Sequence, residues 1–412
     1  MQRRQFITSI GTLGTLAAAG LAKPLVAASA NSAPSSATAG TDASPSLLGG
    51  TPAVFAPTSE SFTVTLPLSA AALAWIEYGE TKSLGLTASS DQWGFVPHDS
   101  KVVKIRVTGL KPGTRYHWRA VLKPLGGKGA GETRTRIYTT KTLSPGAAET
   151  RFSVWNDTHD QAPTIQKLHS LRRNDDDFLL WNGDLSNNVN DASLIPGIYV
   201  SPKGVDLAEG PPIFLARGNH DVRGLWANKM TDYVDFPGDR PFYALRTGPV
   251  GMIVLDTCED KPDAHRTFKG VAAFEPLIRE QSRWLDEVTQ QPALRDAPYR
   301  VVFCHIPLRW TKEVQADYNN KEWDHVSLRG RAAWHDTLVR WGAQVIVSAH
   351  NHRATLIPAT SKFPYAQILG GGRAISNATI IRGHADAKQL KLAATMIHDG
   401  SISHEISFNP LA

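Results

Sequence analysis

The chain has 412 residues, of which 42% are hydrophobic and 20% charged, and this is enough for two or three domains with their own cores. Its formal net charge is +6, but residues 1–30 carry three basic and no acidic side chains, which leaves 41 basic against 38 acidic residues and a charge of +3. A surplus this small gives no reason to expect specific nucleic-acid binding or a membrane surface as a partner.

The first 30 residues have the pattern of an export signal. Arg3 and Arg4 precede a mildly apolar stretch up to Ala22, and Ala28-Ser29-Ala30 offers a cleavage site of small residues. The stretch resembles twin-arginine signals, which imply export of an already folded protein. An ordinary secretory signal and an uncleaved anchor are the alternatives. Because the apolar segment is short and weak, we expect a periplasmic or extracellular protein with no stable membrane span after signal removal.

The next part of the chain predicts a linker followed by a β domain. Residues 31–50 are mostly Ser, Ala, Thr, Pro and Gly, which favours a flexible linker. Residues 51–145 contain short alternating runs typical of strands. Tyr116 and Trp118 follow a tight turn at Pro112-Gly113, and this resembles the corner of fibronectin type III sandwiches. We expect an all-β sandwich that packs against the next domain or restricts access to it, with carbohydrate or surface binding as the alternative.

Residues 150–412 alternate apolar strands with helical patterns, which predicts an α/β domain. Helical stripes begin at Ile165, Leu277 and Trp334, and we expect their aromatic side chains in the core rather than around a cofactor. Asp399-Gly400 lies between two β-like runs and predicts a hairpin near the C-terminus.

The two cysteines, Cys258 and Cys304, each lie at the end of an apolar run. They could form one disulfide in an oxidising compartment or stay two buried thiols, and we favour the thiols. Two cysteines are too few for a disulfide scaffold or a four-thiolate zinc site.

Polar side chains follow five of the apolar runs in the α/β domain. In chain order they are Asp157 with His159, Asp184, Asn219 with His220, His305, and His350 with His352. Because α/β sheets bind ligands at the carboxyl ends of their strands, these side chains should gather at one place. Each piece alone could be a turn, a surface loop or a buried histidine. Together they supply the oxygen and nitrogen ligands that two closely spaced divalent ions need.

In this order the residues resemble the calcineurin-like metallophosphoesterases, whose pattern is D-x-H, G-D, G-N-H-[DE], H and then G-H-x-H. The resemblance covers about 260 residues, from 150 to the C-terminus. With a β-sandwich in front, the layout looks like the purple acid phosphatase group. The fold implied is α/β, a four-layer αββα metallophosphoesterase sandwich at 150–412, preceded by a fibronectin III-like all-β sandwich.

The resemblance also implies a metal site and a reaction. The ligands would fall into two sets, with Asp157, His159, Asp184 and His352 on one ion and Asp184, Asn219, His305 and His350 on the other. Asp184 would bridge two divalent ions, which could be Mn, Fe or Zn. A metal-activated hydroxide would attack the phosphorus of a phosphate ester. His220 would protonate the leaving alkoxide or steady the phosphoryl oxygen, and Asp221 would orient His220.

Three positions depart from the purple acid phosphatase pattern. Asn187 occupies the place of the metal-bound tyrosine, His159 is an additional histidine, and Ala349 replaces a glycine. We therefore expect an Asp- and His-rich site without the iron–tyrosinate colour. The similar-looking stretch Gly383-His384-Ala385-Asp386 lacks the second histidine and a preceding apolar strand, so we exclude it.

Substrate contacts are less sharply predicted. Arg223, Arg309 and Arg353 lie near the motifs and could hold phosphate oxygens. The long connections 258–276 and 309–327 could form pocket walls or lids. The substrate would be a small-molecule or nucleotide phosphate ester, and a phosphomonoester is slightly favoured. A phosphodiesterase or nucleotide pyrophosphatase is the alternative, followed by a non-catalytic surface or binding protein.

Overall fold

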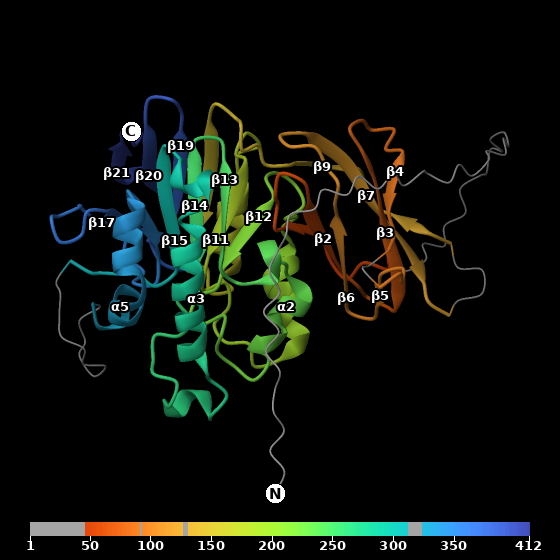
Figure 1. Cartoon of the computed structure of the whole chain (residues 1–412). Coiled ribbons are helices and arrows are strands. Elements are labelled where there is room, and N and C mark those ends of the chain that lie inside the picture. Colours follow the sequence, from red (N-terminus) through yellow and green to blue (C-terminus); the bar gives the residue numbers. More distant parts are fainter. Residues whose placement is uncertain (1–45, 91–92, 127–130, 312–323) are drawn as a thin grey trace, which may run out of the picture. The chain divides into compact units, whose positions relative to one another are not determined.

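The computed structural model describes residues 46–90, 93–126, 131–311 and 324–412 (Figure 1). The expected signal at 1–30 and the expected linker up to residue 45 lie outside these ranges. The last residues of that linker segment lie against the β domain, where Leu47 is buried and Leu48 forms a β-bridge with Leu68. Within the described ranges, no helix combines the length and apolar character needed to cross a membrane.

The first domain consists of antiparallel strands around a core of its own. One sheet contains β4 (Leu86–Ala88), β3 (Ala72–Gly79), β7 (Arg115–Pro124) and β8 (Thr133–Arg134), with β5 (His98–Asp99) on β3 and β9 (Tyr138–Lys141) on β7. The other strands are β1 (Ala53–Phe55), β2 (Phe62–Pro67) and β6 (Val102–Val107). Side chains such as Val64 and Trp118 fill the core between them. The Lys111 amide donates to the Tyr116 hydroxyl oxygen (2.9 Å), which fixes the predicted corner.

This β domain shares a sheet with the α/β domain. Phe55 of β1 pairs with Ile213 of β12 (Ile213–Ala216) in parallel. The strands follow the order β21-β20-β19-β10-β11-β12-β1-β2-β6 in one nine-stranded sheet. Asp235 reinforces the connection because it accepts hydrogen bonds from Thr63 of β2 and Arg106 of β6. The two domains are therefore joined by backbone pairing as well as by side-chain contacts.

Two sheets form the centre of the α/β domain. The nine-stranded sheet contains β10 (Thr150–Trp155), β11 (Phe178–Asn182) and β12 in parallel, then β19 (Thr379–Ala385), β20 (Leu390–Met396) and β21 (Ile402–Phe408). The second sheet has the order β13 (Tyr243–Thr247), β14 (Val250–Leu255), β15 (Tyr299–Cys304), β16 (Val345–Ser348), β18 (Ala366–Leu369) and β17 (Thr355–Ile357). Strands β14, β15 and β16 are parallel. The predicted hairpin at Asp399-Gly400 connects β20 and β21.

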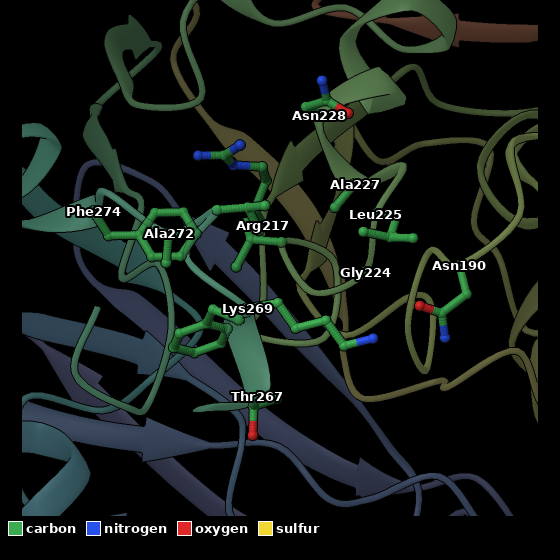
Figure 2. A pocket seen from close by; sticks show the side chains of 13 residues that line it. Asn190, Arg217, Gly224, Leu225, Ala227, Asn228, Thr267, Lys269, Ala272 and Phe274 are labelled. Atoms are coloured by element: carbon green, nitrogen blue, oxygen red, sulfur yellow. The ribbon is translucent and has the colours of Figure 1, made fainter. Parts of the chain in front are cut away.

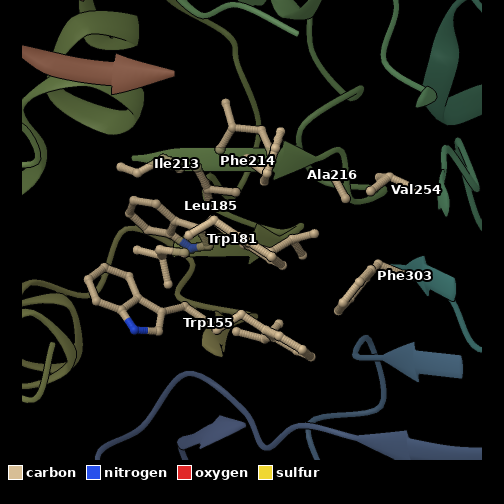
Figure 3. Close-up of a cluster of buried hydrophobic side chains, with 14 of the residues drawn as sticks. Trp155, Trp181, Leu185, Ile213, Phe214, Ala216, Val254 and Phe303 are labelled. Atoms are coloured by element: carbon tan, nitrogen blue, oxygen red, sulfur yellow. The ribbon is translucent and has the colours of Figure 1, made fainter. Parts of the chain in front are cut away.

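The two sheets face each other across a core rich in aromatic rings (Figure 3). Phe152 stacks on Phe178 with ring centroids 5.1 Å apart and meets Phe303 of the second sheet edge-on at 5.6 Å. On the opposite face of the first sheet, Trp155 and Trp181 are fully buried in the same core cluster as side chains of α1 (Ala162–Ser170).

Helices α3 (Phe274–Val288) and α5 (Asp324–Trp341) cover the outer face of the second sheet (Figure 1). The order of layers is therefore helix, sheet, sheet, helix, which confirms the predicted α/β sandwich. Short elements occupy the connections: η1 (Ala192–Leu194), η2 (Pro196–Val200), η3 (Pro202–Gly204), η4 (Ala227–Lys229), α2 (Met230–Tyr233), η5 (Pro237–Asp239), η6 (Arg266–Phe268) and α4 (Pro292–Arg295). Cys258 and Cys304 are separate buried thiols, as the sequence favoured.

Candidate metal centre

The carboxyl ends of five strands meet at one edge of the paired sheets. Strands β10, β11 and β12 are parallel, and so are β15 and β16, so each group releases its following residues at a common end. The residues released are Asp157 and His159 after β10, Asp184 after β11, Asn219 after β12, His305 after β15, and His350 and His352 after β16. The structure thus brings all seven predicted ligands together.

Their ligand atoms form two groups that share Asp184. In each group every ligand atom lies within 4.8 Å of the others, and the groups are Asp157, His159, Asp184 and His352, and Asp184, His305 and His350. Nε2 of His305 is 3.2 Å from Oδ2 of Asp184, and Nε2 of His159 is 3.5 Å from the same oxygen. The amide oxygen of Asn219 is 2.9 Å from Nδ1 of His350, which places it with the second group. This is the division that the family pattern implied.

The residues fit a pair of divalent cations. Asp157 and Asp184 are 0% and 1% exposed, and among the described residues neither forms an ion pair with a lysine or arginine. A buried carboxylate without a compensating cation is strongly unfavourable. Two cations surrounded by carboxylate, imidazole and amide groups would supply that compensation. A ligand set without thiolates suits Mn, Fe or Zn.

The histidines of the site differ in pKa because their surroundings differ. Burial lowers the pKa of His159 to about 4, and burial together with the nearby His305 lowers that of His350 to about 4. Burial also acts to lower the pKa of His305, but the Asp184 carboxylate outweighs it and raises the value to about 10. Neutral imidazole is the form that binds metal. A metal ion that binds His305 must therefore compete with a proton, which the Asp184 carboxylate favours on this ring.

Outer contacts fix the orientation of the ligands. Nδ1 of His305 donates to the main-chain oxygen of Asn182 (2.9 Å), which turns Nε2 toward Asp184. The Asn156 amide donates to Oδ2 of Asp157 (2.9 Å). Such contacts commonly set the tautomer and rotation of metal ligands.

Five of the seven ligand candidates have a left-handed backbone. The φ values lie between 43° and 72° for Asp157, His159, Asp184, His350 and His352. This region costs on the order of 1–3 kcal/mol for a residue other than glycine. Main-chain hydrogen bonds hold two of the turns, from Asp157 to Gly183 (3.1 Å) and from His159 to Asp184 (2.9 Å). The strained turns direct the side chains inward.

Gly218 lies so close to Asp184 that it leaves no room for a side chain, and this leads to a first prediction. A Cβ atom at Gly218 would lie 2.2 Å from Oδ1 of Asp184. We expect Gly218→Ala to displace Asp184 and to weaken metal binding by about 10- to 100-fold, the range seen when a ligand's support is lost. Metal titration of the purified variant measures this. Gly146→Ala is the control, since its Cβ would meet nothing within 4 Å. Equal metal affinity in both variants would contradict the prediction.

His220 lies beside the ligands without belonging to either group. Its main-chain amide donates to Oδ1 of Asp184 (2.8 Å), and its ring is 4.9 Å from that of His159. Nδ1 of His220 donates to the main-chain oxygen of Asn187. The amide of Asn187 in turn donates to the main-chain oxygen of His159 (3.0 Å). The residue at the tyrosine position of the purple enzymes thus orients His220 and leaves Nε2 available for proton transfer.

Asp221 does not orient His220, so that expectation is wrong. The Asp221 carboxylate accepts hydrogen bonds from the amides of Gly218 (2.9 Å) and Ser186 (3.1 Å) and from the Tyr199 hydroxyl (2.9 Å). It is fully buried and ties the Gly218 turn to the segment after Asp184. Burial and the nearby Asp184 charge raise the pKa of Asp221. The sequence offered no signal for Tyr199, which comes from the π-helix η2.

Two of the three predicted phosphate-binding arginines are engaged elsewhere. Arg223 forms a bidentate ion pair with Glu259, with N–O distances of 2.5 and 2.9 Å. Arg309 is buried and donates to main-chain oxygens within 357–365. Neither of these two arginines lines the cavity over the metal ligands. Arg353 is exposed and lines the cavity over the metal ligands.

That cavity has a volume of about 460 Å³. Its walls are Asp184, Asn219, His220, Asp260, His350, Asn351, His352, Arg353 and Asn377. Asp260, Asn351 and Asn377 were not predicted. Asp260 belongs to the 258–276 connection, which does form a wall as expected. Residues 312–323 of the other expected lid lie outside the described ranges.

Residues 150–354 match the family model of the calcineurin-like phosphoesterases, and this stretch contains every ligand candidate. The chain contains a calcineurin-like phosphoesterase domain. Purple acid phosphatase 21 of Arabidopsis thaliana is 23% identical over 284 residues, which cover 67% of this chain and 59% of the plant protein. Human serine/threonine-protein phosphatase CPPED1 is 25% identical over 143 residues, covering 34% and 42%. The chain thus spans only about half the length of these relatives.

Solved structures resemble the phosphoesterase domain together with the β domain. Purple acid phosphatase PPD1 from yellow lupin (Lupinus luteus) seeds superposes with a TM-score of 0.67 at 12% identity, covering 87% of this chain and 74% of the lupin chain. PhoD gives a TM-score of 0.59 at 13% identity, covering 89% and 92%. At these identities the likeness is one of fold, and it is purple acid phosphatase-like in structure.

Proposed function

We propose that this protein is a dinuclear metal-dependent hydrolase of phosphate esters, with phosphomonoesters favoured. The observation that carries the proposal is the pair of ligand groups that share the buried Asp184. The phosphoesterase family match and the phosphatase names of the two sequence relatives support it. The proposal does not depend on Arg223 or Arg309, because neither belongs to a ligand group.

Each residue of the site has a distinct task in this reaction. The first ion would be held by Asp157, His159, Asp184 and His352, and the second by Asp184, Asn219, His305 and His350. Two bound cations would lower the pKa of a coordinated water and would neutralise charge on the phosphoryl oxygens. Arg353, which is exposed and lines the cavity, can hold a phosphoryl oxygen. A His220 ring that is protonated at both nitrogens, with Nδ1–H fixed on the Asn187 oxygen, can give its Nε2 proton to the leaving oxygen and become neutral.

An assay of three substrates tests the proposal. The purified chain, loaded in turn with Mn, Fe or Zn, is given p-nitrophenyl phosphate, bis(p-nitrophenyl) phosphate and ATP. We expect the highest kcat/KM for the monoester. Faster turnover of the diester, or cleavage of ATP between its α and β phosphates, would instead establish a phosphodiesterase or nucleotide pyrophosphatase. If no substrate were turned over with any of the metals, the alternative of a non-catalytic surface or binding protein would be supported instead.

We also propose that the protein is exported through its twin-arginine-type signal to the periplasm or beyond the cell. Arg3 and Arg4 and the small residues up to Ala30 support this. N-terminal sequencing of the mature protein should begin at Asn31. An unprocessed Met1 would contradict cleavage.

A further inference from the structure

A second cavity, of about 320 Å³, lies among the segments that follow His220 and Asp260 (Figure 2). It is lined by Asn190, Arg217, Val222, Gly224, Leu225, Ala227, Asn228, Thr267, Phe268, Lys269, Val271, Ala272 and Phe274. Its size lies at the small end of the range for ligand pockets. None of the residues that the mechanism uses lines it.

Two segments of the chain contribute to both cavities, although no single residue lines both. Residues 219 and 220 line the metal site, and residues 222 and 224 of the same turn line the second cavity. The segment 187–189, whose Asn187 oxygen binds the His220 ring, runs alongside this turn. The Val189 amide donates to the Arg223 oxygen (2.7 Å), and the Trp226 amide donates to the Val189 oxygen (2.9 Å). The connection that places Asp260 in the metal site also supplies Thr267 to Phe274. The second cavity therefore adjoins the side of the site that carries His220.

The lining combines the charge of Lys269 with apolar side chains, while the charge of Arg217 is paired with Asp256. Lys269 is exposed and forms no ion pair within the described part of the chain. Arg217 donates hydrogen bonds from Nε and Nη2 to the Asp256 carboxylate. Its Nη1 donates none to a described residue. Leu225 and Val271 both line the cavity and are 63% and 68% exposed, so they offer apolar surface to a ligand. No carboxylate lines the cavity, so it suits an anionic group on an apolar body.

We propose that this cavity receives the leaving group of the substrate, and that the preferred leaving group is an apolar or aromatic body bearing an anionic substituent. The inference rests on the proposed function, because it places the leaving oxygen beside His220. The apolar body would pack on Leu225 and Val271. The substituent would bind the ammonium group of Lys269.

Two aryl phosphates test the proposal. Phenyl phosphate and 4-(carboxymethyl)phenyl phosphate release phenols of similar acidity, because the methylene group insulates the ring from the carboxylate. The wild-type chain should show a higher kcat/KM for the carboxylated substrate. Lys269→Gln should lower the ratio of the two kcat/KM values roughly fivefold, the upper range for a partly exposed ion pair. Lys388→Gln, an exposed lysine outside both cavities, should leave the ratio unchanged.

A binding measurement separates this inference from the proposed function. In a ligand-observed NMR titration without turnover, 4-hydroxyphenylacetate should bind the wild-type chain more tightly than phenol, and Lys269→Gln should remove the difference. Equal kcat/KM for both phosphates, or an unchanged ratio in Lys269→Gln, overturns the inference and leaves the proposed function standing. No turnover of either phosphate overturns the proposed function, and the leaving-group assignment with it. The titration then decides whether the cavity still binds an anionic aromatic compound.

Discussion

Replacement of Asp184 by Asn should remove both metal ions and lower kcat/KM by at least about 1000-fold. Asp184 is the one residue common to both ligand groups, and its carboxylate is buried. A neutral amide cannot compensate the charge of two cations. Because a metal centre supplies several kcal/mol of transition-state stabilisation, and about 1.4 kcal/mol is a tenfold change in rate, the loss should be large. Elemental analysis and steady-state kinetics measure the two effects.

The matched control for this variant is Asp176→Asn. Asp176 is also a buried carboxylate next to the nine-stranded sheet, where it accepts a hydrogen bond from the Ser153 hydroxyl (2.5 Å), but it belongs to neither ligand group. This control should keep two ions and most of its activity. If Asp184→Asn retained one ion per chain with near wild-type turnover, Asp184 would not be the bridge.

Replacement of His220 by Ala should lower kcat by about 100- to 10,000-fold while both ions stay bound. The reason is that His220 stands beside the ligands and is held by Asn187 through Nδ1, so its loss removes a proton donor without removing a ligand. The loss should be greater for an alkyl phosphate than for p-nitrophenyl phosphate, since nitrophenolate leaves readily without a proton. Kinetics with both substrates and a metal assay measure this.

His404→Ala is the control for His220→Ala because His404 lies on the edge strand β21, hydrogen-bonded to Ser403 and outside both cavities. It should behave as the wild type. An equal loss for both leaving groups in His220→Ala would show that His220 steadies the phosphoryl oxygen instead of donating a proton. An unchanged rate would exclude both tasks.

The ligand set could be predicted because each ligand closely follows an apolar strand in the sequence. An apolar strand that ends in Asp, Asn or His places that side chain at a known end of a parallel sheet, and five such strands converge. The left-handed turns at Asp157 and Asp184 could not be located from the sequence. Asp tolerates this backbone region better than most residues, but that tolerance does not single out these two positions among the other Asp residues of the chain.

Contacts with partners that are distant in the chain were not predicted. Arg223 was expected at the phosphate, but Glu259, 36 residues away, pairs with it. Asp221 was expected to hold its neighbour His220, but the fold turns it toward Tyr199 and the backbone of 185–186. Proximity in the chain was a poor guide to contact in both cases.

The connection between the two domains was equally hidden. The sequence shows a β-sandwich and then an α/β domain, and nothing local indicates that Phe55 pairs with Ile213. Strand pairing over such a separation depends on how the whole sheet closes. The composition of each strand indicates only that it is buried.

The metal content of the purified chain tests the central claim most directly. After reconstitution with Mn, Fe or Zn and removal of loosely bound ions, elemental analysis should find two ions per wild-type chain. The ligand groups around Asp184 require that number. A content of one ion or fewer per chain, whichever metal is supplied, would contradict the dinuclear site.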